Sequence, residues 1–210
     1  MALRLLPFRQ YDEQDVINIF ALKSGDALPS TTGDGEGSNG VFVKVLDGNF
    51  NQDTVTYGTD TYLGKTDYPH VGGDMYPSNP LEVEAADSGE APLGLTLNQT
   101  AKADENGEKL LYNTTKKEEL QAVLPGQSVP VATKGVFTLA ATALEGGTLA
   151  AAGITSVGLG FEVADGGKIS GVASTPGGTS LGLVLGTGSR SSNAGVTDQF
   201  AGDYVVIKLG

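Results

Sequence analysis

The chain has 210 residues and a formal net charge of −12, with 25 acidic residues against 13 basic ones, and it has no cysteine. An acidic surface is repelled by the phosphates of nucleic acids and by anionic lipid headgroups, so we expect neither nucleic acid nor membrane as a partner. The missing cysteine excludes disulfides, thiolate nucleophiles and Cys-ligated metal sites.

The content of turn-forming residues sets the fold class. The chain has 31 Gly and 9 Pro, while Val, Leu and Ile recur throughout, which is typical of many short strands joined by tight turns. We therefore expect a mainly β protein: a small β-barrel or sandwich with long loops, one short α-helix in an insertion, and an extended N-terminal arm. The expected segments are an arm with the first strand at 1–22, a β region at 23–90, and a β-barrel domain at 91–210 with a helical insertion at 101–126.

The first half begins with an extended arm, residues 1–11, because Pro7 opposes a regular helix there. Residues 15–22 alternate as a strand does, although an amphipathic helix stays open for so short a run. The segments 30–40 and 66–80 are polar or Pro-rich and predict loops. Further strands are expected at 41–46, 54–57, 61–63 and 81–85.

The second half is richer in strand patterns. A helix is expected at 115–124, with Thr114 or Thr115 as its N-cap and with Pro125–Gly126 ending it. Asp165–Gly167 predicts a hairpin turn. Strands are expected at 93–97, 129–132, 135–139, 160–163, 168–172, 181–185 and 204–209.

One short stretch of sequence occurs twice. Pro92–Leu97 (PLGLTL) resembles Ser180–Leu185 (SLGLVL), and each is followed by a polar insertion and then by an apolar strand. The likeness is either a weak internal duplication or the recurrent pattern of a β barrel, and the sequence leaves both open.

The residues needed for common enzyme chemistry are missing. The single histidine, His70, lies in an expected loop, and the sequence has no nucleophile elbow, so we expect a surface or interface histidine and no enzyme. The acidic loops 33–40 and 103–108 lack the ligand spacing of an EF-hand and are expected to be solvated turns. We therefore expect no metal and no cofactor.

The N-terminal arm is the expected contact with a partner, because it mixes large apolar side chains with arginines. Either the arm docks on another protein, or it packs on its own domain as an edge strand, and the sequence favours neither. The expected contact residues are Leu3, Arg4, Leu5, Leu6, Phe8, Arg9 and Tyr11.

The second half resembles the head-decoration (cement) proteins of tailed phages. The likeness rests on Gln127–Leu139 (QSVPVATKGVFTL), on the hairpin near 161–172, on Leu181–Leu185 (LGLVL) and on Gly202–Leu209 (GDYVVIKL). It covers about residues 93–209. The N-terminal Phe8–Tyr11 and Val16–Phe20 are similar to virion structural proteins of large marine and cyanobacterial phages.

Residues 1–20 lack the uninterrupted apolar run of a signal peptide, so we expect the protein to be made in the host cytoplasm. The resemblance implies that it binds the outer surface of the capsid. Its partners would be the major capsid protein and further copies of itself, as a trimer. Two alternatives remain: a tail-tube or baseplate component, and a carbohydrate-binding module of the virion. The latter would have to use exposed tyrosines, for which Tyr57, Tyr62, Tyr68 and Tyr76 are the candidates.

Overall fold

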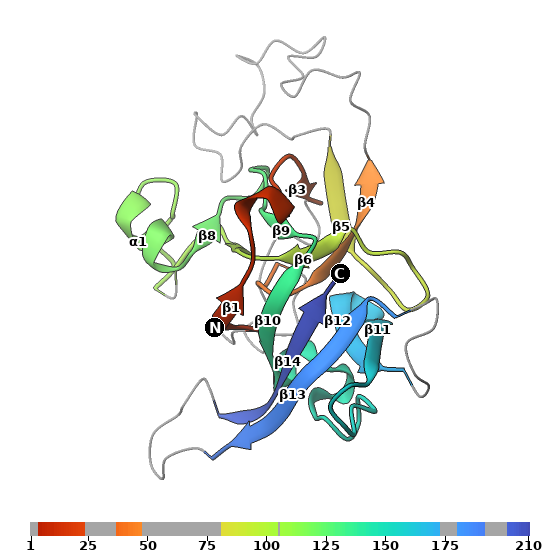
Figure 1. Cartoon of the computed structure of the whole chain (residues 1–210). Coiled ribbons are helices and arrows are strands. Elements are labelled where there is room, and N and C mark those ends of the chain that lie inside the picture. Colours follow the sequence, from red (N-terminus) through yellow and green to blue (C-terminus); the bar gives the residue numbers. More distant parts are fainter. Residues whose placement is uncertain (1–3, 24–36, 48–80, 105, 173–179, 192–200) are drawn as a thin grey trace.

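The computed structural model describes residues 4–23, 37–47, 81–104, 106–172, 180–191 and 201–210 (Figure 1). This part of the chain is mainly β with one short α-helix, so the expected fold class is confirmed. The strands form open sheets that pack as a sandwich does, and no closed barrel is present among these residues. The strands expected at 54–57 and 61–63 lie outside the described residues.

Two six-stranded sheets make up most of the fold. Sheet A has the strand order β1-β10-β14-β13-β11-β12, and sheet B has the order β2-β9-β6-β4-β5-β3. The strands of sheet A are β1 (Leu5–Gln10), β10 (Gly135–Ala140), β11 (Gly160–Ala164), β12 (Lys168–Gly171), β13 (Gly182–Arg190) and β14 (Gly202–Leu209). Those of sheet B are β2 (Val16–Ile17), β3 (Ala21–Leu22), β4 (Phe42–Asp47), β5 (Glu82–Ala85), β6 (Gly94–Thr96) and β9 (Val131–Ala132).

The two sheets share one topology. Without β1 and β3, each sheet has five antiparallel strands, which we number one to five by their order along the chain. In both sheets the spatial order of these strands is then one, five, four, two, three: β10-β14-β13-β11-β12 in sheet A and β2-β9-β6-β4-β5 in sheet B. The edges next to the third strands, β5 and β12, are also similar. β3 pairs with β5 in parallel, and an isolated parallel bridge joins Leu144 to Ile169 of β12. The described chain thus contains the same arrangement twice, with its midpoint between β9 and β10.

The repeated sequence lies at equivalent positions of the two sheets. Gly94 begins β6 and Gly182 begins β13, and each is paired on one side with the second strand of its set, at Val43 and Phe161. On the other side, a Cβ at either glycine would collide with a backbone oxygen of the fifth strand. This agreement in register favours duplication over a chance resemblance. The boundary expected near residue 90 falls between β5 and β6, which belong to the same sheet.

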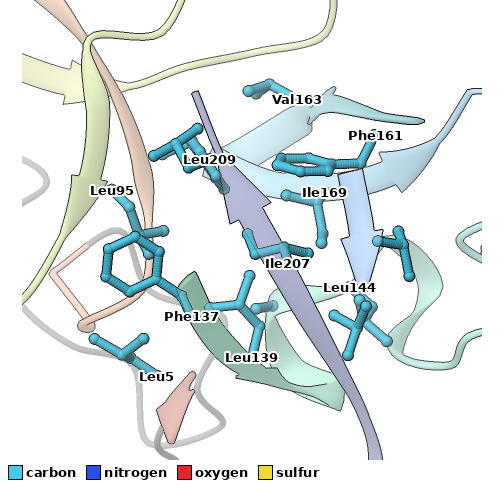
Figure 2. Close-up of a cluster of buried hydrophobic side chains, with 14 of the residues drawn as sticks. Leu5, Leu95, Phe137, Leu139, Leu144, Phe161, Val163, Ile169, Ile207 and Leu209 are labelled. Atoms are coloured by element: carbon cyan, nitrogen blue, oxygen red, sulfur yellow. The ribbon is translucent and has the colours of Figure 1, made fainter. Parts of the chain in front are cut away.

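The largest hydrophobic core lies between the two sheets. Leu95 of sheet B meets Phe137 and Leu5 of sheet A in this core (Figure 2). A second cluster lies against sheet B alone and includes Val43, Val83 and Val131. Burial of each such side chain contributes about 1.5–3 kcal/mol.

The expected helix is present but shorter. Helix α1 spans Thr114–Glu119, and Asn113, not a threonine, is its N-cap, since its side chain accepts a hydrogen bond from the backbone N–H of Lys116 at 3.1 Å. The helix ends early because Gln121 adopts a positive φ of 48°. The next residues form β8 (Ala122–Val123), parallel to β7 (Gln99–Thr100), and bury Ala122 in a small local core. The prediction of helix up to residue 124 is therefore wrong.

Candidate partner-binding surface

The N-terminal strand β1 is fixed to the body of the protein at its first residues. Asn39 Oδ1 accepts hydrogen bonds from the backbone N–H groups of Arg4 and Leu5, each at 3.2 Å. The N–H of Ala140 donates to the carbonyl oxygen of Arg4 at 2.8 Å. These bonds hold residues 4–10 at the edge of sheet A, so of the two possibilities for the arm the edge strand describes this segment.

Three of the expected contact residues are internal. The side chains of Arg4, Leu5 and Leu6 are buried, with at most 3% exposed. Arg4 lies near the turn between β11 and β12, where its Nη1 donates to the carbonyl oxygen of Gly166 at 3.3 Å. These residues stabilise the fold, and in it they are not available to a partner. Leu3 lies outside the described residues.

Phe8 lies in an irregular part of β1 and is exposed. Leu5 pairs with Leu139 and Arg9 pairs with Phe137, so four steps along β1 correspond to two along β10. Pro7 falls within this bulge, where a residue without an N–H group costs no hydrogen bond of the ladder. The side chain of Phe8 is 67% exposed, which makes it one of the most accessible large apolar groups of the described surface.

The end of β1 contacts two different parts of the fold. The ring of Tyr11, 36% exposed, stacks on Phe137 with centroids 5.9 Å apart. The guanidinium of Arg9 donates from Nη2 to Oε1 of Gln121 at 3.3 Å. Arg9 and Tyr11 therefore connect β1 with the insertion and the core, and Phe8 remains the group with the most free surface.

The side of sheet A that faces away from the core has no carboxylate on β1, β10, β13 and β14, whereas the next strand, β11, presents Glu162 on this side between the core residues Phe161 and Val163. Phe137 and Ile207 point into the core, so their neighbours in β10 and β14 point outward, because side chains alternate along a strand. Register extends this outer face to β1 and β13. Thr138 points the same way but is only 3% exposed. We call the following nine residues the outer face of sheet A: Gln10, Val136, Ala140, Leu183, Gly186, Gly188, Tyr204, Val206 and Lys208.

The charges on β13 and β14 at this outer face are positive, and Glu162 lies beside it on β11. Lys208 is exposed within it. The guanidinium of Arg190 lies over the ring of Tyr204, 5.2 Å from its centroid, a cation–π contact. Since the whole chain carries −12, an apolar face with only basic charges stands out from the rest. Part of the sequence signal was present, because Val136 and Thr138 occupy alternate positions of the strand expected at 135–139.

A group of charged side chains lies across sheet B. Lys44 pairs with Glu84, directly opposite it on β5, with 3.0 Å between Nζ and Oε1, and also with Glu90. Glu84 in turn pairs with Lys23 at 2.9 Å. Hydrogen bonds from two lysines lower the pKa of Glu84, and the bond from Lys23 has a larger effect than the bond from Lys44. Hydrogen bonds to two glutamates raise the pKa of Lys44, and the bond to Glu90 has a larger effect than the bond to Glu84. Paired in this way, these groups act as cross-strand braces and not as free acids or bases.

The other candidate chemistry is located as follows. In the loop 103–108, Asp104 Oδ1 accepts the backbone N–H groups of Asn106 and Glu108 at 2.9 and 2.8 Å, as in a turn. Among the described residues, no three His, Asp or Glu side chains gather as a metal site would require, and no helix is long and apolar enough to cross a membrane. His70 and the four candidate tyrosines, Tyr57, Tyr62, Tyr68 and Tyr76, lie outside the described residues, as do residues 33–36 of the first acidic loop.

Comparison with known proteins gives no relative. A scan against models of protein families finds no match, and neither a search of curated proteins nor a search of solved structures finds a similar one.

Proposed function

We propose that this protein decorates a phage head, binding the outer surface of the capsid and bridging subunits of the major capsid protein. The observation that carries the proposal is the outer face of sheet A, which lacks carboxylates and is bordered by the exposed Phe8. The resemblance of residues 93–209 to head-decoration proteins supports the same function. Further copies of the chain, in a trimer, would be its other partners.

The physical basis of such binding is adhesion without chemistry. The cores of protein interfaces are poor in charged residues and rich in aromatic residues and arginine, and Phe8, Tyr204 and Arg190 fit this composition. Burial of Phe8 against a partner contributes about 1.5–3 kcal/mol. A protein that binds only the assembled shell stabilises that shell by mass action.

The test compares substitutions on this face with matched substitutions elsewhere. Phe8→Ser is compared with Val157→Ser, because both side chains are more than 60% exposed, at 67% and 61%. Lys208→Glu is compared with Lys102→Glu, which changes the net charge equally at another exposed position. Each variant is added to capsids lacking the protein, and its occupancy is measured after sedimentation.

Loss of occupancy in Phe8→Ser and Lys208→Glu, with normal occupancy of both controls, is the expected result. Equal occupancy of all four variants would refute binding through the outer face. Mass spectrometry of separated heads and tails tests the location, and recovery with the tails would favour a tail-tube or baseplate component. Deleting residues 1–11 is a poorer test, because it also removes Leu5 from the core.

A further inference from the structure

The sequence contains two Asn-Gly dipeptides, Asn39–Gly40 and Asn106–Gly107, and the fold places them in opposite surroundings. Glycine after asparagine leaves the following backbone nitrogen unhindered, which makes such pairs chemically labile. We infer that Asn106 is a site of spontaneous deamidation, and that the fold protects Asn39 from the same reaction.

The reaction needs only water. The backbone nitrogen of the glycine attacks Cγ of the asparagine, a C–N bond forms, and the bond from Cγ to Nδ2 breaks. Nδ2 leaves as ammonia and takes up the proton of the glycine N–H. Water then opens the resulting cyclic imide at one of its two C–N bonds, which gives aspartate or isoaspartate. The sum is addition of one water and loss of one ammonia.

Hydrogen bonds in the fold protect Asn39 from deamidation. It is only 7% exposed, and its Oδ1 accepts the N–H groups of Arg4 and Leu5. The nitrogen of Gly40 donates to the carbonyl oxygen of Thr96 at 2.7 Å. Bringing Cγ onto that nitrogen breaks all three hydrogen bonds and detaches the start of β1. The reaction at Asn39 therefore requires local unfolding of the body of the protein.

Asn106 has no comparable restraint. It is exposed, in the turn that closes the hairpin between Ala103 and Lys109. Within the described part of the chain, the nitrogen of Gly107 makes only the bond of that turn, to the carbonyl oxygen of Asp104 at 3.1 Å. A Cβ at Gly107 would meet nothing within 4 Å, so the space around the reacting atoms is open. Opening one turn hydrogen bond suffices.

Deamidation here changes the charge of a distinct part of the molecule. The insertion 101–126 contains four lysines and five acidic residues, so one new carboxylate changes its formal charge from −1 to −2. An isoaspartate would also add a methylene to the backbone of the turn. Deamidation of Asn106 does not depend on the partner of the protein, because the two dipeptides and their contacts within the chain determine the rates.

The experiment uses the intact chain and one digest. Cleavage after lysine gives the peptides 24–44 and 103–109, each with a single Asn and no Gln, so a deamidated form of either peptide has a single origin. The folded protein is incubated at mildly alkaline pH, and both peptides are followed by mass spectrometry. Asn106 is expected to react at least about tenfold faster than Asn39, since two more hydrogen bonds protect the latter.

Two further measurements keep the inference open to refutation. In denaturant the two rates should become similar, because both sites have the same dipeptide. Asn106→Gln should remove the fast change in charge of the folded protein while its circular dichroism stays unchanged. Similar rates in the folded protein would overturn the inference. So would a faster reaction at Asn39, which would mean that the N–H groups of Arg4 and Leu5 stabilise the oxyanion of the intermediate.

Discussion

The guanidinium of Arg4 donates from Nη1 to the backbone oxygen of Gly166 at 3.3 Å, across 162 residues of sequence. Gly166 belongs to the turn between β11 and β12, and its own N–H donates to Oδ1 of Asp87 at 3.1 Å. The N–H of the next residue, Gly167, donates to the carbonyl oxygen of Ala86 at 2.9 Å. This turn therefore joins the N-terminus, sheet A and the end of β5 at one place.

Replacing Arg4 should destabilise the protein strongly. The side chain is fully buried, and Arg4→Met keeps much of its volume while removing its hydrogen bonds and leaving the oxygen of Gly166 without this donor. We expect a loss of about 2–4 kcal/mol in the free energy of unfolding, measured with urea. The exposed Arg190→Met is the control and should cost at most about 1 kcal/mol. Equal effects of the two substitutions would contradict a structural role of Arg4.

Removing one buried hydroxyl should stabilise the protein. Thr138 is 3% exposed in the central strand β10, and its Oγ1 has no hydrogen-bond partner in the described structure. Thr138→Val replaces this hydroxyl by a methyl group and suits a strand. The free energy of unfolding should rise by about 1 kcal/mol, because a buried polar atom without a partner is removed. A decrease would indicate that the hydroxyl is satisfied.

The repeated glycines should not tolerate alanine. A Cβ at Gly182 would collide with the backbone oxygen of Lys208 on the neighbouring strand, and one at Gly94 would collide with that of Ala132. Each Gly→Ala substitution should cost about 2 kcal/mol or more in thermal or urea unfolding, because the paired backbones must move apart.

Gly186 provides the control for this prediction. It lies in β13 like Gly182, but a Cβ there would meet only Val206, at an ordinary 3.7 Å. Gly186→Ala should therefore be neutral or slightly stabilising, since it restricts the unfolded chain. If it cost as much as Gly182→Ala, the close approach of the backbones would not be the cause.

Local patterns in the sequence predicted most strands but not how they pair. Alternation of apolar and polar residues marks β10 and β14 directly, and Asp165–Gly167 forms the expected turn between β11 and β12. The helix was overextended because Gln121 leaves the helical region where the side-chain pattern continues. The shared topology of the sheets depends on contacts distant in sequence, of which the repeated Leu-Gly-Leu was the only local sign.

The candidate site shows the same limit. An arm of leucines and arginines predicts contact, yet its acceptor Asn39 lies in a Gly-rich polar stretch that is typical of a solvated loop. The burial of Arg4 and Leu5 follows from that distant asparagine, and no periodicity in residues 1–11 could indicate it. The exposure of Phe8 likewise results from the bulge in β1, which is defined only by the pairing with β10.

The ion pairs across sheet B should make stability depend on pH at both ends of the range. The pKa values of Glu84 and Glu90 are lowered from 4.5, so their contribution is present above pH 4.5 and is lost as the pH falls through the folded-state values. The pKa of Lys44 is raised from 10.5, so its contribution is complete below pH 10.5 and is lost as the pH rises through the folded-state value. Between these limits these groups add no pH dependence.

The contribution of Lys44 can be measured with a matched pair of variants. Lys44→Met removes the side-chain partner of Glu90 and one of the two partners of Glu84, which keeps Lys23, so the melting temperature should fall less steeply below pH 4.5 than in the unchanged protein. Lys102→Met removes the same charge from an exposed position of the insertion, and its melting temperature should fall below pH 4.5 as steeply as that of the unchanged protein. Added salt should reduce the difference between the variants, because pairs at the surface are screened. The same dependence of the melting temperature on acidic pH in both variants would show that the ion pairs of Lys44 do not contribute to stability.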